Sequence, residues 1–120
     1  MSKPAHHHAI NYLEFAAPDL AAVKKFYSTV FGWSFQDWGA DYVSFRAQES
    51  GIDGGFRRGT APATCEDAPL AVLYSSNLEA TEAAIVAAGG SISVPVFTFP
   101  GGRRFHFKDG CGNTLAAWSE

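Results

Sequence analysis

The stretch that decides the fold is residues 18–33, Pro-Asp-Leu-Ala-Ala-Val-Lys-Lys-Phe-Tyr-Ser-Thr-Val-Phe-Gly-Trp. Asp19 is a favourable residue for capping the start of a helix, and Gly32 is a typical residue for ending one. Between them the apolar side chains recur with helical spacing, at Leu20, Val23, Phe26 or Tyr27, Val30 and Phe31. The stretch therefore predicts an amphipathic helix of about three turns.

Strand patterns surround this helix. Residues 10–16 alternate between apolar and polar side chains, and Pro18 closes the run. Three further short strands are predicted after the helix, over residues 33–38, 42–47 and 52–57, separated by turn residues such as Gly39 and Gly51. The first half of the chain thus has the order strand, helix, strand, strand, strand.

The second half repeats this order. Strands are predicted over residues 70–75, 91–97, 103–108 and 114–118, with Pro95 marking an edge or a bend, and Asn77 caps a helix that ends at Gly89-Gly90. Leu70 follows Ile10 by 60 residues and Leu78 follows Leu20 by 58, a nearly constant offset. The predicted fold class is α+β: two tandem βαβββ modules that form a curved eight-stranded assembly with the helices outside. A single domain is expected over residues 1–120, with module 1 at about 10–58, a linker at 59–69 and module 2 at about 70–119.

Composition narrows the function classes. With 120 residues, 47% of them hydrophobic, the chain can bury one core without disulfides or metal. Its net charge of −3 has the wrong sign for a nucleic-acid-binding protein. Cys65 and Cys111 form no disulfide framework. The first residues of the sequence lack the apolar run that is typical of a signal peptide, and no stretch approaches the roughly 18 apolar residues of a membrane span. We therefore expect a cytoplasmic protein with no nucleic-acid or membrane partner.

Three motifs together indicate a family. They are residues 18–33, Ala87-Ala88-Gly89-Gly90 at the end of the second helix, and Phe107-Lys108-Asp109-Gly110-Cys111-Gly112-Asn113 before the last strand. In combination the chain resembles the vicinal oxygen chelate superfamily, which includes glyoxalases, bleomycin resistance proteins and extradiol dioxygenases. The resemblance implies sheets that curve around a cavity, and in the metal enzymes a divalent ion held by two His and two carboxylates.

The positions that match these metal ligands carry other residues here. The first-strand position falls on Tyr12, its equivalent in the second module on Leu70, and the last-strand position on Ala116. The fourth lies within residues 53–55, where Asp53 is the one side chain able to ligate. At least three of the four ligands are therefore replaced, and no metal cofactor is expected under the leading interpretation.

Strand alternation assigns faces to the remaining polar side chains. Leu13 and Phe15 share the face that packs against the helix, so Tyr12 and Glu14 point toward the cavity. A partly buried Glu14 would have the raised pKa of a general base and is the candidate catalytic residue, although such a residue is also often hydrogen-bonded or solvated.

The same reasoning yields the candidate ligand-binding residues, which are Tyr12, Tyr42, Arg46, Tyr74, His106 and Trp118. Arg46 is suited to a substrate carboxylate, and its alternative place is the solvated surface. His106 has the alternative of being solvated or structurally hydrogen-bonded. Tyr74 and Trp118 are expected on the cavity side of the second module.

Three functions follow as hypotheses. The leading one is a non-metal family member that binds a small, mainly apolar or aromatic molecule in the cavity. The alternative is a glyoxalase-type lyase or isomerase, or a dioxygenase, that holds a metal through Asp53, Glu14 and His106, with a metal-free enzyme using Glu14 as a variant. The third is an interaction module with no ligand. The family and the exposed sheet edges lead us to expect a homodimer. The residues His6 to His8 are interpreted as a terminal tail.

Overall fold

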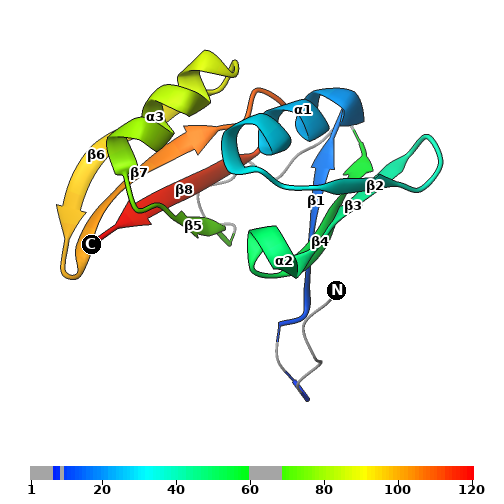
Figure 1. Cartoon of the computed structure of the whole chain (residues 1–120), viewed down its shortest axis with the longest axis horizontal. Helices are drawn as coiled ribbons and strands as arrows, with labels where there is room; N and C mark the ends of the chain where they lie inside the picture. Colours follow the sequence, from blue (N-terminus) through cyan, green and yellow to red (C-terminus); the bar gives the residue numbers. More distant parts are fainter. Residues whose placement is uncertain (1–6, 9, 60–68) are drawn as a thin grey trace. The chain divides into compact units, whose positions relative to one another are not determined.

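A computed structural model describes residues 7–8, 10–59 and 69–120 of the chain (Figure 1). The chain divides into two compact units, residues 1–62 and 63–120. Cys65, His6 and most of the predicted linker at 59–69 lie outside the described residues. The first unit contains β1 (Tyr12–Ala17), α1 (Leu20–Phe31), β2 (Phe35–Asp37), β3 (Tyr42–Phe45), α2 (Ala47–Ser50) and β4 (Asp53–Arg58).

The second unit repeats the pattern of the first. It contains β5 (Val72–Tyr74), α3 (Leu78–Ala87), β6 (Ser91–Phe99), β7 (Gly102–Lys108) and β8 (Thr114–Ser119). The strand order is β1-β4-β3-β2 in one sheet and β5-β8-β7-β6 in the other, with the first and last strand of each unit paired in parallel. The predicted tandem of βαβββ modules is confirmed as two four-stranded sheets with helices.

The caps predicted for α1 and α3 are those observed. The Asp19 carboxylate accepts a hydrogen bond from the Ala22 N–H at 3.1 Å, and Gly32 ends α1 in the left-handed conformation at φ 73°. The Asn77 side chain accepts from the Ala80 N–H at 3.1 Å, also three residues on. Asp19 and Asn77 each satisfy a backbone donor that the first turn of a helix leaves without a partner.

One predicted strand ends earlier than expected. The sequence predicts a strand over residues 42–47, but Ala47 begins α2, a single helical turn that Gly51 closes at φ 88°. The Asp53 carboxylate accepts a hydrogen bond from the Ala47 N–H at 2.7 Å and so favours a turn over continued pairing with β4. This contact is made by a residue six positions along the chain, which strand alternation does not report.

An aromatic cluster forms the core of the first unit on the helix side of its sheet. Tyr27 of α1 stacks on Trp33 at 4.9 Å between ring centroids, and Trp33 packs on Phe45 of β3 at 4.6 Å. Phe56 of β4 is fully buried and lies 5.1 Å from Phe15 of β1. The packing face predicted for β1 is therefore correct, and Phe45 shows that β3 also packs an aromatic side chain on this side.

The core of the second unit is more aliphatic. Phe105 and Phe107 of β7 are fully buried, as are Leu78 and Ile85 of α3. The tight turn before β8 is organised by the buried carboxylate of Asp109, which accepts hydrogen bonds from the backbone N–H groups of Cys111 and Asn113, while Gly110 and Gly112 adopt positive φ.

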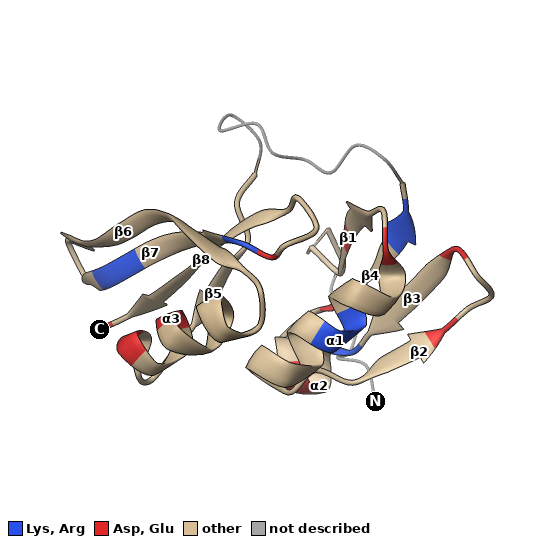
Figure 2. Ribbon diagram, turned by 90° about the horizontal axis from the view of Figure 1, so that it is seen from above, with Lys and Arg blue, Asp and Glu red and all other residues tan. Residues whose placement is uncertain are grey.

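β6 is an edge strand, and its pairing with β7 shifts register on both sides of Val94, where Pro95 interrupts the ladder. Figure 2 shows Lys and Arg on several elements rather than along one strand or helix. Among the described residues no helix is long and apolar enough to cross a membrane.

Candidate functional site

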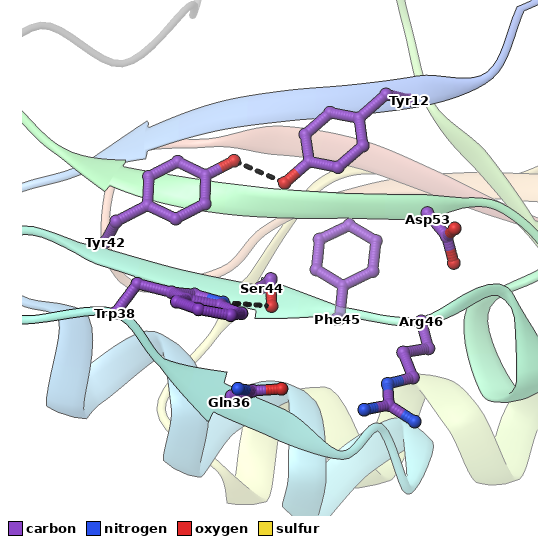
Figure 3. A pocket seen from close by; sticks show the side chains of 8 residues that line it. All are labelled: Tyr12, Gln36, Trp38, Tyr42, Ser44, Phe45, Arg46 and Asp53. Carbon is purple, nitrogen blue, oxygen red and sulfur yellow. Dashed lines mark hydrogen bonds between the residues drawn. The ribbon is translucent and has the colours of Figure 1, made fainter. Parts of the chain in front are cut away.

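The face of the first sheet turned away from α1 carries a pocket of about 570 Å³. Figure 3 shows the side chains that line it. They come from all four strands of the sheet and the loops next to them: Tyr12, Gln36, Trp38, Tyr42, Ser44, Phe45, Arg46 and Asp53. Three of the predicted ligand-binding residues, Tyr12, Tyr42 and Arg46, are thus brought together in one place.

Two tyrosines form one wall of this pocket. Tyr42 of β3 extends across β4, and its hydroxyl lies 2.5 Å from the hydroxyl of Tyr12 on β1. The intervening position on β4 is Gly55, where a Cβ atom would stand only 2.4 Å from the Tyr42 hydroxyl. Because glycine leaves that space empty, the Tyr42 ring can lie on the backbone and meet Tyr12 across a strand.

The environment of the Tyr42 phenol keeps it protonated. Its pKa is raised well above the ordinary value, first by burial and then by hydrogen bonds with Tyr12 and Glu14. A phenol with a raised pKa is a hydrogen-bond donor or acceptor at neutral pH and not a base. This wall of the pocket therefore offers the neutral hydroxyl of Tyr42 on an aromatic surface.

The opposite wall is built by the β2–β3 hairpin. The Trp38 indole N–H donates a hydrogen bond to the Ser44 hydroxyl at 2.8 Å, which fixes the ring while 57% of the residue stays exposed. Gln36 pairs with Ser44 across the ladder, so both face the pocket. Arg46 lies at the end of β3 on the rim (Figure 3).

The pairing of β1 with β4 fixes the register that the sequence left open at residues 53–55. Asp53 stands opposite Tyr12, and its carboxylate accepts the hydrogen bond from the Ala47 N–H. In the second unit the residue opposite Ala116 is Val72. Within each unit, no three His, Cys, Asp or Glu side chains of the described residues gather closely enough to hold a metal ion.

Glu14, the candidate base, lies next to this pocket but is not buried. Its side chain is 48% exposed, and its carboxylate is 3.9 Å from the Arg57 guanidinium, on the neighbouring strand. On this geometry Glu14 influences the pocket by helping to raise the pKa of Tyr42. A catalytic role for Glu14 stays a prediction.

The other three candidates, Tyr74, His106 and Trp118, belong to the second sheet. Tyr74 and Trp118 meet edge to face at 5.2 Å, and the Tyr74 hydroxyl donates to the Glu120 carboxylate at 2.5 Å. The pKa of His106 is lowered by burial and by the charge of Arg104. The Nε2 atom of His106 is buried and has no hydrogen-bond partner among the described residues.

Sequence reasoning missed part of the first pocket. Gln36 and Trp38 are not among the binding residues predicted from the sequence, although Trp38 follows Gln36 by two residues and so shares its face of the strand. The Gly39-Ala40-Asp41 turn then brings this face alongside Tyr42 and Ser44. The sequence feature that indicates this face is the alternation of β2. Because β2 is only three residues long, the pattern is weak.

Comparisons with known proteins identify the fold. A family model described as the Glyoxalase/Bleomycin resistance protein/Dioxygenase superfamily matches residues 9–117. No curated protein matches the sequence significantly.

Solved structures give the same answer. A glyoxalase/bleomycin resistance protein from Albidiferax ferrireducens T118 is 19% identical with a TM-score of 0.72, covering 92% of this chain and 98% of its own. A glyoxalase-related enzyme from Fulvimarina pelagi is 18% identical with a TM-score of 0.74, covering 94% and 88%. A genomically encoded fosfomycin resistance protein from Listeria monocytogenes is 14% identical with a TM-score of 0.75, covering 93% of each chain. At these identities the likeness shows the fold alone.

Proposed function

Because the chain belongs to the glyoxalase/bleomycin resistance protein/dioxygenase superfamily, we propose that it binds a small, mainly apolar or aromatic molecule, without a metal ion, in the pocket of its first sheet. The observation that carries this proposal is the lining itself. Four of the eight lining residues are aromatic, and polar groups among them are held in place by hydrogen bonds between Tyr12 and Tyr42 and between Trp38 and Ser44. Apolar walls with a few fixed polar groups are the usual composition of a small-molecule site.

The replaced ligand positions support the metal-free part of the proposal. Tyr12 stands where the resemblance expects a first-strand ligand, and its hydroxyl is bonded to another phenol. The Asp53 carboxylate opposite it is used to order α2. Ala116 has no group that ligates a metal. Binding and orientation by this chain's own side chains are thus the chemistry that the site offers.

The names of the relatives include both resistance proteins and an enzyme. Sequestration of a small molecule, as a resistance protein would perform, needs a pocket with fixed walls and no reacting group. The pocket described above meets that requirement: its side chains are neutral apart from Arg46 and Asp53, and the raised pKa of Tyr42 keeps that phenol protonated at neutral pH.

The proposal is tested with a neutral aromatic probe, N-phenyl-1-naphthylamine, whose fluorescence rises when it leaves water. We expect saturable binding to the full chain, weakened about tenfold by Trp38→Ala, since losing a ring contact of about 1.4 kcal/mol changes a dissociation constant tenfold. Val86→Ala is the control, because Val86 of α3 is an equally exposed apolar side chain, at 54%. Absence of saturable binding would contradict the proposal.

Elemental analysis of dialysed protein tests the metal-free part separately. The proposal predicts less than about one-tenth of an equivalent of any divalent metal, a threshold well below the full occupancy of a structural or catalytic metal site. A stoichiometric divalent metal would overturn it and favour the lyase, isomerase or dioxygenase alternative.

Four further expectations belong to this proposal. The two units act as one domain spanning residues 1–120, the protein is cytoplasmic, and it forms a homodimer, for which the edge strands β2 and β6 give physical support. Tyr74, His106 and Trp118 line a second ligand-facing surface on the open side of the second sheet. Sedimentation equilibrium tests the homodimer, since a monomer at micromolar concentration would contradict it.

A further inference from the structure

The five arginines of the chain differ in what their guanidinium groups contact. Three are paired with carboxylates: Arg57 with Glu14, Arg58 with Asp41 and Arg103 with Glu79. A fourth, Arg104, packs over the rings of Phe97 and Phe99 at 5.4 and 5.7 Å. The fifth arginine differs from these four in its contacts.

That arginine is Arg46, on the rim of the proposed binding pocket. Across residues 7–8, 10–59 and 69–120 its guanidinium has no hydrogen bond, ion pair or ring contact. It lines the pocket and also a neighbouring hollow of about 400 Å³, so it lies between the two. In Figure 3 its side chain extends from the end of β3 away from Tyr12.

The carboxylates around Arg46 are engaged with backbone groups. Asp53, which lines the pocket, accepts the hydrogen bond from the Ala47 N–H at 2.7 Å. Glu49, which lines the neighbouring hollow, accepts from the Ser34 N–H at 3.4 Å. The cationic group at the mouth of the pocket is therefore available to a molecule that enters it.

We infer that the molecule bound in this pocket is an aromatic carboxylate, with its ring system against Tyr42 and Trp38 and its carboxylate on the Arg46 guanidinium. The inference rests on the proposed function and names the class of ligand. A guanidinium presents its N–H donors in a planar fork that matches a carboxylate, and such charge-assisted pairs are about twice as strong as neutral hydrogen bonds. The volume of about 570 Å³ accommodates a fused two-ring compound.

Three probes with one ring system separate charge from shape. They are 2-naphthoate, its neutral analogue 2-naphthamide and the cation 2-naphthylmethylammonium, each titrated calorimetrically into the full chain at neutral pH. We expect 2-naphthoate to bind about tenfold more tightly than 2-naphthamide, the effect of one exposed charge-assisted contact, and the cation to bind most weakly.

Two variants assign the effect to Arg46. Arg46→Gln removes the positive charge at the pocket, and we expect it to lower the affinity for 2-naphthoate to that for 2-naphthamide. The affinity for 2-naphthamide itself should change less than about twofold, because this neutral probe loses no charge-assisted contact. Arg58→Gln removes the same charge from a residue that does not line the pocket and should leave all three affinities unchanged.

The outcomes separate failure of the aromatic-carboxylate inference from failure of the proposed function. Equal affinities for 2-naphthoate and 2-naphthamide, unchanged by Arg46→Gln, would overturn the aromatic carboxylate while leaving small-molecule binding in place. An equal loss of 2-naphthoate affinity in both arginine variants would overturn the assignment to Arg46. If none of the three probes binds, the proposed function itself fails.

Discussion

Replacing Gly55 by alanine is the sharpest perturbation of the pocket wall. Gly55 does not have a positive φ, so its backbone conformation is compatible with alanine. The effect of the substitution therefore comes from steric overlap of the new Cβ atom with its neighbours. The new Cβ would stand 2.4 Å from the Tyr42 hydroxyl, 2.6 Å from its ring and 2.7 Å from the carbonyl oxygen of Val43. Ordinary contact begins at 3.4 Å, so the phenol must move by about 1.0 Å, the difference between 3.4 and 2.4 Å.

The expected cost combines two effects. Overpacking a well-filled position costs about 1–3 kcal/mol. A shift of 1 Å also breaks the 2.5 Å contact with Tyr12, which contributes about 0.5–1.5 kcal/mol. We therefore expect Gly55→Ala to lower the free energy of unfolding by about 1.5–4.5 kcal/mol, the sum of the two effects. We also expect it to weaken binding of N-phenyl-1-naphthylamine, because the displaced Tyr42 ring enters the pocket.

Urea unfolding followed by tryptophan fluorescence measures this cost. The matched experiment places Gly55→Ala in a Tyr42→Ala background, where the contact with the phenol is gone and the contact with the Val43 carbonyl persists. The cost should then fall by at least about half, since coupled residues in contact are not additive. An equal cost in both backgrounds, or a loss under about 0.5 kcal/mol in the parent chain, the size of an ordinary surface substitution, would refute the reasoning.

Three further predictions follow. Because the pKa of Tyr42 is raised, the folded state keeps a proton that an unfolded tyrosine loses near pH 10, so stability holds below about pH 10 and falls above it; Tyr42→Phe should make the loss of stability between pH 9 and 11 shallower, and an unchanged slope would contradict this. Asp109→Ala leaves the Cys111 and Asn113 N–H groups without their acceptor and should cost about 1–3 kcal/mol in urea unfolding, whereas a neutral result would show that the turn does not depend on this carboxylate. Asp19→Ala removes the cap of α1 and should cost about 0.5–2 kcal/mol, with Asp19→Asn as the conservative control that retains most of the stability.

Features that depend on local chemistry were predictable from the sequence. The limits of α1 follow from the Asp19 cap and the Gly32 stop, both of which act within one helical turn. The faces of β1 and β3 follow from alternation, which places Tyr12 and Tyr42 on the side away from the helix. These local rules sufficed for the fold and for three residues of the pocket.

Features that depend on contacts between strands were not predictable. Gly55 looks like an ordinary turn or strand glycine in the sequence, and its role emerges from the Tyr42 ring that crosses β4 above it. α2 depends on a hydrogen bond from the Ala47 N–H to a carboxylate on the next strand. Trp38 enters the site because a hairpin folds it back beside Ser44. In each case the deciding partner lies several residues away, where periodicity carries no information.

The most direct test of metal-free binding in this pocket uses the indole N–H resonances of the three tryptophans. 2-Naphthoate is titrated into the chain in the presence of EDTA, which removes divalent metal. The account predicts a saturable shift of the Trp38 indole resonance, with the resonance of Trp33, 6% exposed in the core, unchanged. A Trp38 resonance that stays fixed, or that shifts only after zinc or nickel is restored, would contradict it.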